Sequence, residues 1–400
     1  MDTTSIKRVL RSVEVRESGT QSIGKLVSDV HFVSSDAPVQ AVADDIRDDT
    51  GLLAVGVVDE DMRVVGIIVR DEFLTLMARP FARDVLRNRS VNEVMTETTS
   101  FAVDRNLFSI AEEIDDQMRA PGITYYLLHD EHRRFAGVFS TQDMLIYLSR
   151  MTQNDIGLAR QLQSRIVKGE NLVSGQTFEF ASSSATAKGV GGDYYMIKRY
   201  SDTNWIIAMC DVSGKGVAAS IVTSMLYGVM SVFDFRRGLA DFVKQLNEHI
   251  VHTFETEKFV TAVFMDYNEQ TGIAKFCDMG HSHMFLLREG KLMRVQSSKD
   301  NLPIGIVPKI EPVINKLKPQ DGDLLFLLTD GLLEQQNGSG EEYSLEQVGD
   351  IIRNGQDDPV EFIVERVQKD FHAFRGNHHL VDDVTFAFMK FVRQEVTLEH

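Results

Sequence analysis

The stretch Asp211-Val212-Ser213-Gly214-Lys215-Gly216 follows an apolar run, residues 205–210, that predicts a β-strand. Three more short acidic motifs occur along the chain: Gly191-Gly192-Asp193, Thr329-Asp330-Gly331 and Asp382-Asp383-Val384-Thr385. At least three of the four motifs stand where a predicted strand ends or starts. Asp beside Gly is common turn chemistry, so one such motif alone would indicate little. Four together predict a site of carboxylate ligands, which Mg²⁺ and Mn²⁺ prefer.

The chemistry of the stretch from Asp211 to Gly216 suits two cations and an anionic substrate. The Asp211 carboxylate can bridge two metal ions, and the backbone carbonyl of Val212 can add an oxygen ligand without adding charge. The glycines allow a tight turn into a helix predicted from Val217, whose N-terminus favours an anion, with Lys215 nearby. Two divalent ions about 3.5–4 Å apart can acidify a shared water and hold phosphoryl oxygens for in-line attack.

Composition and charge limit the class of protein. The chain has 400 residues, enough for two or three domains, and 43% of them are hydrophobic. The formal net charge is −17, spread along the chain, which argues against nucleic acid or an anionic membrane as the main partner. Because no apolar stretch approaches the ~20 residues of a membrane span and no signal region opens the chain, we expect a cytoplasmic protein. Cys210 and Cys277 lie within apolar runs, as free thiols of a reducing compartment do.

The N-terminal third contains one pattern twice. The first copy has predicted strands at residues 53–58 and 64–69, with a helix beginning near Asp71. The second has a predicted helix at 107–119, strands at 124–128 and 135–139, and a helix from Gln142. A repeat of roughly 60 residues with this order predicts two similar modules packed together.

The two copies resemble a tandem CBS (Bateman) module. Residues 66–72 and 137–143 carry the resemblance, a Gly, apolar residues, a hydroxyl residue and an acid at set spacing. The second copy fits this pattern fully, whereas the first has Val69 in place of the hydroxyl residue. The resemblance implies that Ser140 and Asp143 contact an adenine nucleotide. Ser140 could equally cap the following helix, and such modules can serve only for dimerisation.

Six segments are expected along the chain. A helical connector links the CBS pair to the C-terminal domain, and Leu158, Leu162 and Ile166 recur on it at four-residue spacing. This narrow apolar seam could pack on the following domain or contact a second copy of the chain, and the second alternative predicts a homodimer. The last residues read as a tag scar. The expected segments are an N-terminal segment 1–24, CBS motifs 25–86 and 87–150, the connector 151–170, a C-terminal domain 171–393 and a tail 394–400.

The C-terminal domain is predicted to be α+β. Nine strands are expected, with helices between some of them, so two sheets with helices outside are the expected architecture. The helix over residues 217–233 carries no charge and is expected to be buried on both sides. The expected strands are 176–181, 192–199, 204–210, 259–267, 272–278, 283–288, 291–295, 322–329 and 384–391.

Residues 155–393 resemble the PPM-type metal-dependent Ser/Thr phosphatases, in particular the SpoIIE/RsbU-like branch. The resemblance includes the stretch 158–163 before the domain, the four acidic motifs, Gly280-His281 and the stretch 302–305. It implies a β-sandwich flanked by helices. It also implies a two-metal centre of Mn²⁺ or Mg²⁺ held by the following groups: Asp193, Asp211, the Val212 carbonyl, Asp330, Asp382 and, as a weaker candidate, Asp383.

Two positions depart from the pattern of this branch. Met196 stands where an Asp often follows the paired aromatic residues, and Asp278 stands where Asn is usual. A histidine used as a general acid in the eukaryotic branch is replaced by Ser213. His281 is a candidate general acid, but a single histidine in a turn is usually structural, so the general acid stays unassigned.

The resemblance implies an enzyme that removes phosphate from Ser or Thr of a partner protein by a metal-activated water, with the CBS module as its regulator. In this branch the usual substrate is a phosphorylated anti-sigma-factor antagonist. Two other functions remain open. One is a nucleotide-sensing scaffold with a phosphatase-like partner-binding domain, and the other is a nucleotide hydrolase. Metal titration would separate a scaffold from an enzyme, and ATP as a substrate would test the hydrolase.

Overall fold

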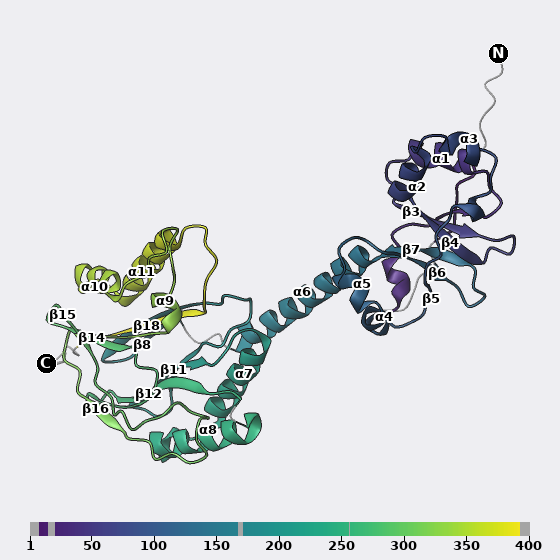
Figure 1. Ribbon diagram of the computed structural model, residues 1–400. Helices are drawn as coiled ribbons and strands as arrows, with labels where there is room; N and C mark the ends of the chain where they lie inside the picture. Colours follow the sequence, from purple (N-terminus) through teal and green to yellow (C-terminus); the bar gives the residue numbers. More distant parts are fainter. Residues whose placement is uncertain (1–7, 15–20, 167–170, 256, 393–400) are drawn as a thin grey trace. The chain divides into compact units, whose positions relative to one another are not determined.

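The computed structural model describes residues 8–14, 21–166, 171–255 and 257–392 (Figure 1). The chain divides into two compact units, Met1–Asn154 and Asp155–His400. The last residues of the expected connector, 167–170, and the expected tail, 394–400, lie outside the described residues.

Unit one contains two small sheets with the same pairing pattern. In the first sheet β2 pairs with β3 in parallel and β3 pairs with β4 antiparallel; in the second, β5 pairs with β6 in parallel and β6 with β7 antiparallel. The repeat seen in the sequence is therefore a repeat of structure. The strands are β1 Arg11–Ser12, β2 His31–Ser34, β3 Ala54–Val58, β4 Val64–Val69, β5 Ser100–Ala102, β6 Tyr125–His129 and β7 Phe135–Ser140.

Helices cover these sheets, and one apolar cluster joins the two repeats. Side chains from both sheets, among them Phe32, Leu127 and Phe135, pack in this cluster. The helix expected at 107–119 is broken at Ile114 into α4 and α5. The helical segments are η1 Ile23–Leu26, α1 Val39–Asp48, α2 Arg70–Met77, α3 Ala82–Leu86, η2 Val91–Glu93, α4 Leu107–Glu113 and α5 Asp115–Arg119.

Helix α6, Thr141–Ile166, runs without a break across the boundary between the two units. It starts directly after β7, so the connector expected from residue 151 is the second half of this longer helix. Leu158 and Leu162 of the predicted seam are exposed. No helix among the described residues has the length and apolar character to span a bilayer.

Unit two is a sandwich of two antiparallel sheets, which confirms the α+β expectation. The sheet orders are β10-β11-β12-β13-β16 and β15-β14-β17-β18-β9-β8. An apolar layer containing Phe180, Ile207 and Leu325 lies between them. The strands are β8 Leu172–Ser174, β9 Phe178–Ala185, β10 Tyr194–Arg199, β11 Asn204–Val212, β12 Val260–Asn268, β13 Ile273–Met279, β14 Met284–Arg288, β15 Lys291–Arg294, β16 Asn315–Leu317, β17 Leu324–Leu328 and β18 Val384–Phe391.

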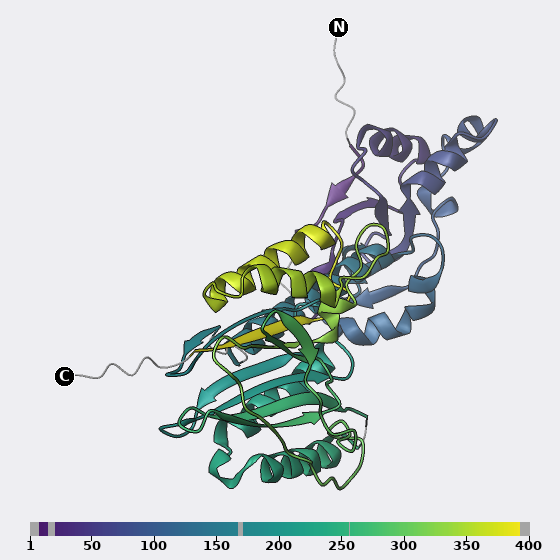
Figure 2. The same cartoon turned by 90° about the vertical axis from the view of Figure 1, so that its left-hand side faces the viewer.

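Helices cover both outer faces of the sandwich. Leu226 of α7 and Phe242 of α8 pack in the apolar cluster over the first sheet, and Ile352 of α10 and Val367 of α11 pack in the cluster over the second. Figure 2 shows the yellow-green helices α10 and α11 on one side of the stacked sheets and a green helix on the other. The helices are α7 Val217–Val232, η3 Phe235–Arg237, α8 Leu239–Phe254, α9 Asp330–Leu333, α10 Leu345–Asn354 and α11 Val360–Arg375.

The expectation that helix α7 is buried on both sides is wrong. Its buried residues, such as Val222 and Leu226, lie on one face against the first sheet. The exposed fractions of Val217, Ile221 and Val232 on the other face are 47, 57 and 84%. A helix without charges has no polar stripe to mark its outer side, so the sequence pattern could not separate the two faces.

Candidate active site

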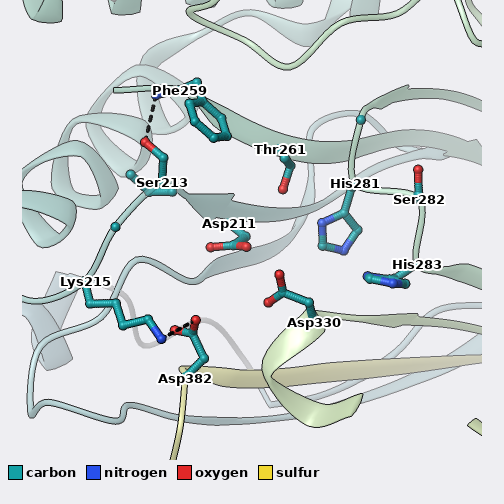
Figure 3. A pocket seen from close by; sticks show the side chains of 13 residues that line it. Asp211, Ser213, Lys215, Phe259, Thr261, His281, Ser282, His283, Asp330 and Asp382 are labelled. Atoms are coloured by element: carbon teal, nitrogen blue, oxygen red, sulfur yellow. Dashed lines mark hydrogen bonds and ion pairs between the residues drawn. The ribbon is translucent and has the colours of Figure 1, made fainter. Parts of the chain in front are cut away.

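A pocket of about 410 Å³ opens at one edge of the sandwich and is lined by three of the predicted carboxylates, Asp211, Asp330 and Asp382. Figure 3 shows Asp211 at its centre, with Asp330 and Asp382 below and Phe259, Thr261 and three residues of the 281–283 turn around it. Asp211 lies near the end of β11. Asp330 is separated from the end of β17 by Thr329 alone, and Asp382 lies just before the start of β18. The ends of strands from both sheets therefore meet at this edge.

Crowding of carboxylates gives the pocket its electrostatic character. Burial, followed by the negative charges of Asp330 and Asp382, raises the pKa of Asp211 to about 7. Asp193 lies buried just before β10, and burial, with the charge of Asp211, raises its pKa well above the ordinary value. The hydroxyl of Thr329 donates a hydrogen bond to Asp193 Oδ2 at 2.8 Å. Such a group of acids is stabilised in its charged form by cations, so these residues suit divalent metal ions.

The ammonium group of Lys215 contacts one of these carboxylates. Lys215 Nζ lies 2.6 Å from Asp382 Oδ2 and donates a hydrogen bond to the carbonyl of Val381 at 2.8 Å. No three histidine, cysteine or acidic side chains within the described part of the chain stand close enough together to hold one ion. The carboxylates thus share a pocket without converging on one point, and Asp382 has Lys215 as its cation.

Asp383 holds the loop that carries the first acidic motif. Its carboxylate accepts hydrogen bonds from the N–H groups of Ala187 at 2.8 Å and Gly192 at 2.6 Å. A Cβ at Gly191 would stand 2.6 Å from Asp383 Oδ2, and one at Gly192 would stand 2.9 Å from the Val212 carbonyl oxygen. Both glycines are therefore needed for close backbone approach, and Asp383 positions Asp193 through this loop.

Gln163 of α6 also contacts this loop, and the sequence did not single it out. Its amide group donates to the Gly191 carbonyl at 2.7 Å and accepts from the Gly191 N–H at 3.0 Å. The hydroxyl of Thr223 on α7 donates to the same carbonyl at 3.2 Å. On the sequence, Gln163 belongs to the polar face of the connector, and nothing in the pattern marks it as buried.

The turn that follows β13 contributes two histidines. Burial lowers the pKa of His281 to about 4, so its imidazole is neutral, and its Nε2 is buried without a hydrogen-bond partner among the described residues. Burial also lowers the pKa of His283. The Asp278 carboxylate accepts from the N–H groups of His281 and Ser282 at 2.8 and 3.2 Å. Asp278 at a position where this branch usually has Asn is therefore compatible with an ordered turn.

In unit one, the predicted nucleotide contacts Ser140 and Asp143 bond to each other. The Ser140 hydroxyl and N–H donate to Asp143 Oδ2 at 2.6 and 2.8 Å, and the Asp143 N–H donates to Ser140 Oγ at 3.2 Å. This is a reciprocal cap at the start of α6, the structural alternative that the sequence left open. Nucleotide binding at these residues stays a prediction.

The fold and the acidic pocket are those expected of a PPM-type phosphatase domain. Its fold is similar to that of the SiaA-PP2C domain of Pseudomonas aeruginosa, with a TM-score of 0.52 at 16% identity, over 61% of this chain and 98% of that one. Residues 201–392 match the family described as Stage II sporulation protein E (SpoIIE), and residues 23–79 match the CBS domain. The C-terminal part of the chain is therefore similar to SpoIIE/RsbU-like PPM phosphatases, and residues 23–79 are similar to a CBS domain.

Two curated proteins are similar to the C-terminal part of the chain. Phosphoserine phosphatase RsbU of Bacillus subtilis is 23% identical over 220 residues, which are 54% of this chain and 62% of RsbU. Stage II sporulation protein E of Priestia megaterium is 24% identical over 182 residues, 44% of this chain and 31% of that protein. The chain thus spans less than two thirds of the length of either relative.

Proposed function

We propose that this protein is a metal-dependent phosphoprotein phosphatase that hydrolyses phosphoserine or phosphothreonine on a partner protein. One observation carries the proposal: Asp211, Asp330 and Asp382 line one pocket of a SpoIIE-type sandwich, and the pKa of Asp211 is raised to about 7 by burial and by its neighbours. The similarity to a phosphoserine phosphatase supports the same reaction class.

The proposed metal ligands are the groups that the sequence indicated: Asp193, Asp211, the Val212 carbonyl, Asp330, Asp382 and Asp383. When bound there, two Mn²⁺ or Mg²⁺ ions would supply the positive charge that offsets the carboxylates and the phosphoryl oxygens and makes a water more acidic. Asp211 and Asp193 would hold this charge between the two sheets. Asp383 would act chiefly by fixing the loop of Gly191 and Gly192 through its two hydrogen bonds.

The remaining groups of the pocket would bind and orient the substrate. Helix α7 begins at Val217, directly after Gly216. The loop before it has positive φ angles of 85° at Gly214 and 79° at Gly216. The free N–H groups of its first turn favour a phosphoryl group nearby. The Lys215 ammonium is close enough to Asp382 to orient that carboxylate, and the neutral imidazole of His281 contributes no charge to the site.

For the substrate we propose a phosphorylated anti-sigma-factor antagonist in the cytoplasm, whose dephosphorylation would free it to bind a kinase-type anti-sigma factor. We place regulation in the CBS module, with an adenine nucleotide near Ser140 and Asp143 as the signal. A homodimer formed through the exposed Leu158 and Leu162 of α6 would bring two copies of the connector together. We expect neither nucleic acid nor membrane as a partner, because the net charge is −17.

A second function, a nucleotide-sensing scaffold that binds partners without turnover, is favoured by one contact. Lys215 places its ammonium group on Asp382, where a catalytic metal ion would otherwise be the cation. In a scaffold this ion pair would be permanent, and divalent ions would not be required.

Hydrolysis of p-nitrophenyl phosphate by the full chain separates the two functions. It would be measured with Mn²⁺, Mg²⁺ or a chelator, with and without AMP or ATP, beside Asp330→Asn. We expect turnover that needs the metal and is lost in the variant, and a nucleotide effect would support regulation by the CBS module. Absence of turnover on this substrate and on phosphoserine peptides under every condition would favour the scaffold.

A further inference from the structure

An aromatic side chain stands at the mouth of the acidic pocket. Phe259 lines the pocket together with the three carboxylates, and 38% of its surface is exposed (Figure 3). Its N–H donates a hydrogen bond to Ser213 Oγ at 3.0 Å, and its carbonyl accepts one from the Ser213 N–H at 2.9 Å. The backbone of Phe259 is therefore attached to the acidic motif of Asp211 by two hydrogen bonds, which keep this residue beside the pocket.

The loop of residues 302–306 carries exposed apolar groups and lies against the backbone of residues 259 and 260. Val260 and Ile304 exchange two backbone hydrogen bonds of 2.8 and 2.9 Å, which fasten the loop to the start of β12. Gly305 has φ of +95°, and a Cβ on it would lie 3.4 Å from the Cα of Phe259. The neighbouring residues Leu302 and Ile306 are 44 and 43% exposed. Phe259, Leu302 and Ile306 are called the apolar rim below.

The length of a phosphoserine side chain decides what meets the apolar rim. Its phosphorus atom is separated from the backbone only by Cβ and Oγ, so a phosphate that reaches Asp211 and Asp330 brings the peptide backbone to the pocket mouth. The residues on either side of the phosphoserine must then lie against the walls of that mouth. Apolar side chains gain free energy when they leave water for an apolar surface of this kind.

Among the described residues, the opposite wall of the pocket offers no apolar surface to the neighbours of the phosphoserine. Asp330 and Asp382 line the pocket there, and the charge of Asp330 raises the pKa of the nearby Glu334. Lys215 on this side is already paired with Asp382. An aspartate next to the phosphoserine would lose hydration against the apolar rim, whereas a leucine would gain free energy there.

We propose that Phe259, with Leu302 and Ile306, binds an apolar side chain adjoining the phosphoserine of the substrate protein and so determines which phosphoproteins are hydrolysed. This inference rests on the proposed phosphatase function. It concerns substrate choice, and the chemical step stays with the carboxylates.

The test pairs two enzymes with three peptides. Nine-residue phosphoserine peptides would carry Leu, Asn or Asp at both positions adjoining the phosphoserine, since Leu and Asn have similar size and differ in polarity. For the full chain with Mn²⁺, we expect kcat/KM for the Leu peptide to exceed that for the Asn peptide about tenfold, with the Asp peptide slowest. In Phe259→Ala the kcat/KM for the Leu peptide divided by that for the Asn peptide should fall to a value between about 1 and 3.

Two further variants keep the result interpretable. Phe259→Leu keeps an apolar group at the rim and should retain a clear preference for Leu, which excludes a general loss of structure as the cause. Leu172→Ala removes a similarly exposed apolar group from β8, outside the pocket lining, and should leave the ratio as in the parent. Thermal melting of each variant would be recorded beside the kinetics.

The two hypotheses fail in different ways. Turnover of all peptides at equal kcat/KM, or a Leu preference that survives in Phe259→Ala, overturns the assignment of the apolar rim and leaves the phosphatase function intact. Absence of metal-dependent turnover of every peptide and of p-nitrophenyl phosphate overturns the phosphatase function and the rim assignment with it.

Discussion

The side-chain amide of Gln163 hydrogen-bonds both backbone groups of Gly191, accepting from its N–H at 3.0 Å and donating to its carbonyl at 2.7 Å. Both partners are buried. Gly191 and Gly192 lead directly into Asp193, and Gly192 is fixed from the other side by Asp383 at 2.6 Å. The connector helix α6 is therefore attached by one side chain to the loop that positions a proposed metal ligand.

Replacing Gln163 by Ala should weaken both the fold and the site. The change leaves the buried N–H and carbonyl of Gly191 without this partner, which costs about 1–3 kcal/mol in the free energy of unfolding. Because the loop of Asp193 loses a support, metal-dependent turnover should fall more than stability alone explains. Urea denaturation and p-nitrophenyl phosphate kinetics would measure the two effects. Gln161→Ala, at an exposed position of the same helix, is the matched control, and equal effects of the two changes would contradict the role of Gln163.

The sequence was a good guide to the sandwich because its strands are long apolar runs. Predicted strand 204–210 is the core of β11, and three of the four acidic motifs contribute a carboxylate to one pocket, whereas Asp193 is not among its lining residues. The pattern could not reveal β16, Asn315–Leu317, because three residues are too few to show alternation.

Contacts between distant residues were the part that the sequence could not supply. Lys215 and Asp382 are far apart in the chain, and neither one has a local signal of pairing with the other. The burial of Gln163 is similar, since periodicity separates apolar from polar residues and cannot show that a polar group has found backbone partners. The exposed face of α7 could not be predicted either, because neither face of this helix carries a charge that would mark it as exposed to solvent.

Asp211→Asn should separate folding from metal binding. The pKa of Asp211 is raised to about 7, so near neutral pH its charged form is destabilised by burial and by Asp330 and Asp382. A neutral amide removes this repulsion, so without metal the variant should melt at the same or a higher temperature than the parent. Addition of Mn²⁺ should stabilise the parent and have a much smaller effect on the variant, and turnover should be lost. Differential scanning calorimetry with chelator or Mn²⁺ tests this, and near-normal turnover in the variant would remove Asp211 from the site.

His281 should make the stability of the protein depend on pH. Its pKa is about 4 in the folded chain because of burial, against an ordinary value of 6.5. Between these values the unfolded chain binds a proton that the folded chain does not, so the free energy of unfolding falls as the pH decreases from 6.5 to 4. The full effect is about 3 kcal/mol, at ~1.4 kcal/mol per pH unit. Denaturation at pH 7.5 and pH 5 should show a smaller loss of stability in His281→Gln than in the parent. An identical loss in both proteins would show that His281 does not control it.

Lys215→Met tests whether the ion pair with Asp382 competes with a divalent cation. In the parent the ammonium lies 2.6 Å from Asp382 Oδ2, and both side chains are about one third exposed or less. The pair itself therefore adds little to stability, about 0–1 kcal/mol, so the melting temperature without metal should change little. Without the ammonium, Asp382 has no fixed cation, and the affinity for Mn²⁺ measured by calorimetry should rise severalfold. Lys244 lies on α8, outside the pocket lining, and forms an exposed ion pair with Glu311; Lys244→Met should leave Mn²⁺ affinity unchanged. A weaker affinity for Mn²⁺ in Lys215→Met would mean that Lys215 holds Asp382 in the orientation that a metal ion needs. The ion pair would then be part of the catalytic site. It would no longer support the scaffold function.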